Sequence, residues 1–233
     1  PWVLYGMTMS FVAESRRAVG IAGGMLVIFL VCLVTGGYPY YAYYSLFLFG
    51  PYLFIFLIPA LRKSLLGHLQ ISIQRGLLTV GVASAISLIV CLPYLLSIRQ
   101  LLAQTTDRTG NSYEYSTAHV FDVEDTVGSL VYPPASSAEG WYFFSVTALL
   151  VISLHLFSRP WFTWGKTYFV LWFTIISYIS YGKSSYLFTL LWKTLPGFSA
   201  LRVWGRLNIV LVPILAYLLA IAFAQLVLRL SAK

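Results

Sequence analysis

Charged side chains are scarce in this sequence: 15 Lys or Arg and seven Asp or Glu make up only 9% of its 233 residues. Because charged residues form about a quarter of an ordinary soluble domain, this composition excludes a water-soluble globular protein. Hydrophobic residues reach 59%, and the mean hydropathy is +0.82. We therefore predict an integral membrane protein, whose partner is the lipid bilayer and which has no nucleic-acid partner.

Cysteine is also nearly absent, since only Cys32 and Cys91 are present and both lie in apolar stretches. Neither a disulfide framework nor a zinc cluster can be assembled from them. The opening stretch PWVLYGMTMSFVA lacks the basic segment and cleavage site of a signal peptide. We expect this stretch to be the end of a helix, and the chain to be a fragment of a longer protein.

Six apolar stretches approach the length of about 20 residues that a helix needs to cross a bilayer. They are residues 18–34, 40–61, 77–98, 141–157, about 166–181, and 207–228. These stretches predict an all-α, polytopic bundle, because a membrane barrel would show strands of about ten residues with alternating polarity. Their internal prolines are expected to kink the helices and not to end them; they are Pro51, Pro59, Pro93 and Pro213.

We predict one transmembrane domain over residues 1–233, with outer loops at about 99–139 and about 182–206. The cations orient it: residues 14–17, 62–75, 158–166 and the C-terminal tail hold nine Lys or Arg and one acid, so this side is predicted to be cytoplasmic. Four of the six remaining cations lie within residues 183–206. Because cations are disfavoured in short outer loops, this concentration indicates a function.

The stretch LPGFSALRVWGRLNIV, residues 195–210, places Arg202 and Arg206 four positions apart. Ser199 is predicted to cap a helix that continues into the last span, so that both arginines share one face. Two cations beside a helix N-terminus are unfavourable unless an anion neutralises them, and phosphate suits both the free amides and the guanidinium groups.

We predict a lipid-phosphate site formed by four cations, namely Arg202, Arg206, Lys193 and Lys183. The alternative is that these side chains reach lipid headgroups at the outer interface without binding a specific ligand. Between Lys183 and Leu195, apolar residues at helical spacing predict a short interfacial helix.

The long outer loop holds the weak catalytic candidates Asp122 and Asp125. Their spacing resembles a capping box at the start of a short helix, which Pro133 and Pro134 would end. Solvated capping acids are the favoured interpretation, and a base or a ligand set for a divalent cation is the alternative. His119 is expected to be solvated, with a catalytic role as its alternative.

Four stretches together resemble the later membrane helices of bacterial GT-C-type glycosyltransferases, in particular the YfhO-type multispanning membrane proteins. They are CLPYLLSIRQ (91–100), VEDTVGSLVYPP (123–134), GWYFFSVTALL (140–150) and LPGFSALRVWGR (195–206). The last resembles a family pattern of Leu-Pro-Gly-Phe followed by two arginines that open a helix, although Trp204 stands where relatives tend to carry proline.

The resemblance implies a multi-pass protein of the bacterial cytoplasmic membrane with functional loops facing outward. It implies glycosyl transfer from a polyprenyl-phosphate-linked sugar to a cell-envelope acceptor, with Arg202 and Arg206 at the carrier's phosphate. The resemblance also implies that the catalytic acid lies upstream of this chain; the cofactor stays unknown, with a divalent cation as one option.

Two other functions fit an outer anion site: a transporter or flippase of a lipid-linked anionic substrate, and an O-antigen polymerase or ligase. Transporters usually carry ionisable residues at mid-membrane depth, beside broken helices, and often show paired repeats. The predicted spans hold no mid-depth acid or base and the sequence shows no internal repeat, which favours the transferase over the transporter.

Overall fold

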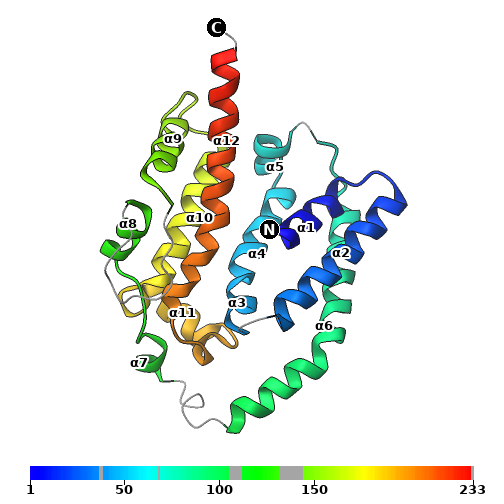
Figure 1. The fold of residues 1–233 in the computed structure, drawn as a ribbon, viewed down its shortest axis with the longest axis vertical. Helices are drawn as coiled ribbons and strands as arrows, with labels where there is room; N and C mark the ends of the chain where they lie inside the picture. Colours follow the sequence, from blue (N-terminus) through cyan, green and yellow to red (C-terminus); the bar gives the residue numbers. More distant parts are fainter. Residues whose placement is uncertain (37–38, 68, 105–111, 132–143, 232–233) are drawn as a thin grey trace. The chain divides into compact units, whose positions relative to one another are not determined.

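The computed structural model describes residues 1–36, 39–67, 69–104, 112–131 and 144–231, and within these ranges it contains helices and no strands. The predicted all-α class is therefore confirmed. The contacts of the chain divide it into two compact units, Pro1–Asp107 and Arg108–Lys233 (Figure 1).

The first unit is built around three helices that pack on one another, α1, α2 and α6 (Figure 1). Its helices are α1 (Trp2–Val12), α2 (Arg16–Thr35), α3 (Pro39–Tyr44), α4 (Leu46–Leu57), α5 (Pro59–Leu66) and α6 (Ile73–Gln104). Val3 and Met7 of α1, Leu26 of α2 and Ala83 of α6 form a buried cluster between them. Helix α1 confirms that the first residues are helical, and whether they end a longer helix stays a prediction.

At one end of this unit, α1 and α6 approach each other closely because α6 carries a glycine there. Phe11 of α1 is 1% exposed and stacks on Phe56, with ring centroids 4.3 Å apart. A Cβ atom at Gly76 would lie 2.5 Å from Cγ of Phe11. The absence of a side chain at Gly76 therefore allows the Phe11 ring to lie against the first turns of α6.

The second unit centres on α12, which packs against α9 and α10 (Figure 1). Its helices are α7 (Tyr113–Ser116), α8 (Val123–Val131), α9 (Val146–Leu156), α10 (Trp164–Ser180), α11 (Tyr186–Thr194) and α12 (Leu211–Ser231). The described residues of this unit also include the 3-10 segments η2 (Gly182–Ser184), η3 (Phe198–Ala200) and η4 (Trp204–Val210). Helix α11 confirms the short helix predicted between Lys183 and Leu195.

A buried lysine donates hydrogen bonds to the backbone of the loop between α9 and α10. Lys166 is 9% exposed, and its Nζ donates hydrogen bonds to the backbone oxygens of Ser158 at 2.8 Å and Pro160 at 3.0 Å. On α9 itself, Nδ1 of His155 lies 2.9 Å from Oε1 of Gln225 on α12. Lys166, in the first turn of α10, therefore supplies hydrogen-bond donors to backbone carbonyls that follow the C-terminus of α9.

Four helical stretches in the described residues are long and apolar enough to cross a membrane: Arg16–Thr35, Tyr40–Leu57, Ile73–Leu101 and Trp204–Val227. They match four of the six predicted spans and support an integral membrane protein. The count of six is not confirmed. Helix α9 has only 11 residues, and the start of its predicted stretch, 141–143, lies outside the described residues. Helix α10 has 17.

Three of the four prolines lie inside helices and do not end them, as predicted, whereas the fourth does not. Pro51, Pro93 and Pro213 lie within α4, α6 and α12, whereas Pro59 separates α4 from α5. Ile58 before it is extended, with a ψ of 115°, and Pro59 occupies the first turn of α5. The expectation of a kink at Pro59 is therefore wrong, because proline disfavours helical geometry in the preceding residue and suits a helix start.

Candidate functional site

The arginine segment, residues 195–210, folds as two short 3-10 turns joined by an extended link. Gly197 turns the chain after α11 with a φ of 80°, and η3 follows it. Val203 then adopts the left-handed conformation, with a φ of 62°, before η4 begins at Trp204. For a β-branched residue this conformation is an outlier that costs about 1–2 kcal/mol.

Two local predictions for this segment are wrong. Ser199 does not cap the last helix, since it lies within η3 and the residue before η4 is Val203. Arg202 and Arg206 do not share a helix face, because Arg202 precedes the left-handed residue and only Arg206 lies in η4. A helix cannot continue through a left-handed Val203. The helical segment that leads into α12 therefore begins with η4 at Trp204, five residues after Ser199.

Three aromatic rings pack together within the arginine segment and against α11. Trp204 is fully buried and stacks on Phe198 with centroids 3.7 Å apart and an interplanar angle of 19°. Phe188 of α11 meets both rings edge-on, 5.1 Å from Phe198 and 5.6 Å from Trp204. The indole Nε1 of Trp204 also donates to the Leu201 oxygen at 3.3 Å. This packing fixes the backbone on both sides of Arg202.

Arg202 is half-buried and lies over the ring of Tyr115, with Cζ 5.3 Å from the ring centroid. Such a cation–π contact contributes about 0.5–1 kcal/mol at an exposed site and more when desolvated. Arg206 is half-buried as well, and its backbone N–H donates to the Val203 oxygen at 3.0 Å. Neither arginine extends fully into solvent.

Helix α7 is fastened to the arginine segment through the buried hydroxyl of Ser116. This hydroxyl donates to the Ser199 backbone oxygen at 3.1 Å and accepts a bond from Nε1 of Trp192 at 3.1 Å. The Tyr113 hydroxyl lies 2.8 Å from the Thr189 hydroxyl on α11. Helix α7, from the first predicted outer loop, therefore packs on α11 and the arginine segment, which belong to the second predicted outer loop.

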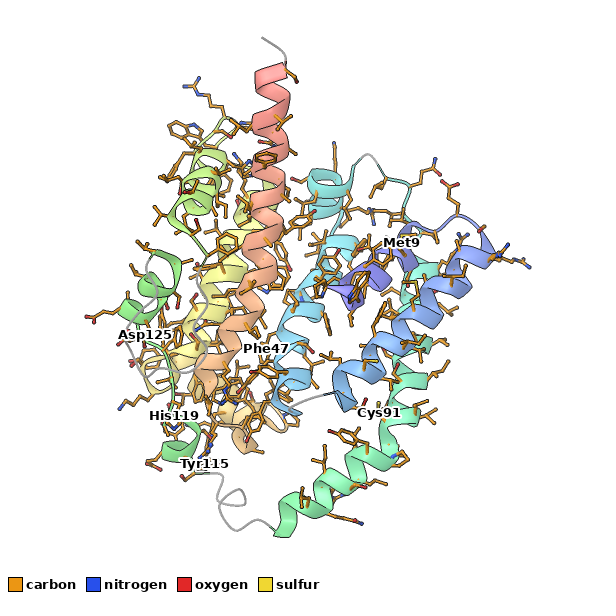
Figure 2. The ribbon with its side chains drawn as sticks, in the orientation of Figure 1. Met9, Phe47, Cys91, Tyr115, His119 and Asp125 are labelled. Carbon is orange, nitrogen blue, oxygen red and sulfur yellow. The ribbon has the colours of Figure 1, made fainter. Side chains whose placement is uncertain are left out.

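The link between α7 and α8 continues this contact along its backbone. The Gly205 N–H, next to Arg206, donates to the His119 oxygen at 3.1 Å, and the Phe121 N–H donates to the Ser180 oxygen at 3.0 Å. The His119 side chain itself is exposed. Tyr115, His119 and Asp125 follow one another along this part of the chain (Figure 2). The structure thus brings the backbone of His119 to the arginine segment.

The two candidate acids form the capping box that their spacing predicts. The Asp125 N–H donates to Oδ1 of Asp122 at 2.7 Å, and the Asp122 N–H donates to Oδ2 of Asp125 at 3.2 Å, at the start of α8. These bonds give the carboxylates a structural task. Among the described residues, no group of three or more His, Cys, Asp or Glu is placed to hold a metal ion. Pro133 and Pro134 lie outside the described residues.

The two lysines predicted at the site are both exposed. Lys183 lies in η2, and Lys193 lies in the last turn of α11, where a cation faces the negative end of the helix dipole. Within the described part of the chain, neither side chain makes a hydrogen bond or ring contact with Arg202 or Arg206. Their contribution to a phosphate site stays a prediction.

Sequence reasoning missed three residues that shape the site. Tyr115 and Ser116 carry no motif, and only the fold shows that they meet the arginine segment. Asn208 is fully buried in η4, and neither its Oδ1 nor its Nδ2 has a hydrogen-bond partner among the described residues. Buried amides are usually paired, so a lone Asn in an apolar run was the available signal.

Comparisons with protein families, with curated proteins and with solved structures found no match for this chain.

Proposed function

We propose that the arginine segment binds the phosphate of a polyprenyl-phosphate-linked sugar, and that the protein transfers this sugar to a cell-envelope acceptor on the outer face of the membrane. The observation that carries the proposal is the position of Arg202, held half-buried over Tyr115 beside an anchored backbone. The resemblance of residues 195–206 to the arginine pattern of GT-C-type transferases supports the same site.

The contact with Tyr115 suits phosphate recognition. A guanidinium group held over a ring face presents its N–H donors around its edge, in the fork geometry that matches phosphate oxygens. The aromatic packing beneath Trp204 holds the backbone between the two arginines in place. Because the groups are positioned before the ligand arrives, little ordering remains to oppose binding.

The reaction breaks the bond between the anomeric carbon and the phosphate oxygen, and the bonding electrons leave with the phosphate. The acceptor hydroxyl oxygen forms the new bond to the anomeric carbon from the opposite face, which inverts the configuration of that carbon, and the hydroxyl proton passes to a general base. Negative charge grows on the departing phosphate. Fixed cations at Arg202 and Arg206 therefore stabilise the transition state more than the bound substrate.

The proposal is tested by measuring how tightly the purified full chain in detergent binds polyprenyl phosphate. Polyprenol, which lacks the phosphate, is the matched control ligand. Native mass spectrometry measures the binding of each ligand. The R202Q/R206Q variant is expected to lose most of its affinity for polyprenyl phosphate, by a factor of ten or more, since charged hydrogen bonds contribute about 1.5–3 kcal/mol. Its affinity for polyprenol should stay unchanged.

The matched control is K63Q/R159Q, which removes two exposed cations from the predicted cytoplasmic side. This variant should bind polyprenyl phosphate like the wild type. Wild-type affinity in R202Q/R206Q, with a wild-type melting temperature, would refute the arginine site. A transfer assay with membranes from cells that express the same variants then shows whether loss of binding abolishes glycosyl transfer.

A further inference from the structure

The first unit contains a cavity of about 350 Å³ at the end where α1 meets the start of α6. Its walls are residues 11–14, residues 70–72 and Arg75. This volume lies at the lower end of the roughly 300–1,000 Å³ that small-molecule sites occupy. No residue of the arginine segment belongs to this unit.

Backbone hydrogen bonds hold the two walls of the cavity together. The Ser72 N–H donates to the Phe11 oxygen at 3.0 Å. Nη1 of Arg75 donates to the Ala13 oxygen at 2.9 Å and to the Glu14 oxygen at 3.3 Å. The cavity is therefore formed before any ligand binds, and the Arg75 guanidinium is fixed at its edge.

The polar groups of the lining retain unused hydrogen-bonding capacity. Both bonds of Arg75 use Nη1, which leaves Nε and Nη2 as donors. In the part of the chain that the structure describes, the Ser72 hydroxyl, the Gln70 amide and the Glu14 carboxylate make no side-chain bonds. The cavity thus offers a cation and neutral donors on one wall and a carboxylate on the other.

The cavity lies at the level where membrane-spanning helices begin. One apolar span, Arg16–Thr35, starts two residues after Glu14, and another, Ile73–Leu101, starts directly after Ser72. Since the ends of spanning helices lie at the headgroup layer, the cavity opens at that depth. Ile21 and Leu78, early in the two spans, are 55% and 68% exposed and offer apolar surface to acyl chains.

We propose that this cavity binds a zwitterionic phosphoethanolamine group, as carried by a membrane phospholipid. Arg75 contacts the phosphate through Nε and Nη2, Ser72 and Gln70 donate to its remaining oxygens, and the Glu14 carboxylate accepts from the ammonium. A purely anionic headgroup brings no positive group to the Glu14 carboxylate. The pairing of one cation with one acid therefore selects a headgroup that carries both charges.

Native mass spectrometry of the purified full chain, with phosphatidylethanolamine, phosphatidylglycerol or water-soluble phosphoethanolamine added, tests the site. The wild type is expected to prefer phosphatidylethanolamine over phosphatidylglycerol. E14Q should remove this preference while keeping affinity for phosphatidylglycerol, because only the ammonium contact is lost. R75Q should lower the affinity for both lipids about tenfold, since it removes a charged hydrogen-bond partner of the phosphate.

Two controls separate this site from the arginine segment and from folding effects. K63Q, which removes an exposed cation from the nearby α5, and R202Q/R206Q should both bind phosphatidylethanolamine like the wild type. If R75Q lowers the melting temperature, E14Q and S72A carry the test, because neither side chain makes a bond within the described residues.

Equal binding of both lipids by the wild type, or an unchanged preference in E14Q, would overturn the proposal. Displacement of phosphatidylethanolamine by equimolar phosphoethanolamine would assign the site to a water-soluble phosphate ester and overturn the lipid as its source.

Discussion

The packing of α1 on α6 makes a sharp prediction at two glycines of the same helix. Gly76 is buried against Phe11, whereas Gly81, one and a half turns further along α6, has no atom within 4 Å of the position of a Cβ. Replacing glycine with alanine at either position makes the helix more stable by about 0.8–1.0 kcal/mol through helix propensity alone. Only at Gly76 does the added methyl group also collide with a packed ring.

The difference between G76A and G81A therefore isolates the cost of overpacking. A Cβ atom at Gly76 would lie 2.5 Å from Cγ of Phe11, and the Phe11 ring cannot retreat because it stacks on Phe56 at 4.3 Å. Inserting a methyl group into such a contact costs about 1–3 kcal/mol. In a protein of this size, a loss of about 1 kcal/mol in unfolding free energy lowers the melting temperature by about 2–4 °C. The melting temperature of G76A should therefore lie roughly 2–12 °C below that of G81A.

Thermal unfolding of the detergent-solubilised protein, followed by circular dichroism at one scan rate, measures this difference. The F11A background provides the internal check, because removal of the ring should make G76A no more costly than G81A. Equal melting temperatures for G76A and G81A in the presence of Phe11 would show that the ring does not press on α6. The observed contact between α1 and α6 would then be wrong.

Two further predictions concern the arginine segment. S116A should lower the free energy of unfolding by about 1–2 kcal/mol, because the donor to the Ser199 oxygen and the acceptor for Trp192 are both lost. The control T35A should have no effect, because it removes only an exposed hydrogen bond within α2. N208L should raise the melting temperature or leave it unchanged, since an unpaired buried amide is replaced by an apolar side chain; a fall of several degrees would show that the amide has a stabilising partner.

The parts of the fold that the sequence predicts correctly are those set by nearby residues. The predicted span at residues 18–34 is a continuous apolar run and lies within Arg16–Thr35, and the structure adds a cap at Ser15, which accepts a bond from the Ala18 N–H. The capping box of Asp122 and Asp125 depends on side chains three positions apart. In both cases the decisive interactions lie within one turn of a helix, so the local pattern is sufficient.

The arginine segment departs from its local pattern because distant residues decide its shape. Local propensity favours a helix from Ser199 onward, but in the structure Trp204 is buried against Phe198 and Phe188, and the preceding residue, Val203, is left-handed. Burying a large aromatic side chain is worth about 1.5–3 kcal/mol or more, which exceeds the strain of about 1–2 kcal/mol. No periodicity in the sequence can reveal this competition.

Charge balance connects the two proposed phosphate sites. The chain carries 15 Lys or Arg against seven Asp or Glu, so its cationic side chains outnumber its carboxylates by eight. The structure holds Arg202 over the ring of Tyr115 and Arg75 on two backbone carbonyls, and both contacts fix the position of the guanidinium group. A cation at the membrane interface is costly to desolvate without a counter-charge. Phosphate groups of lipids are the abundant anions at that depth, and both proposals assign them as the counter-charges of these arginines.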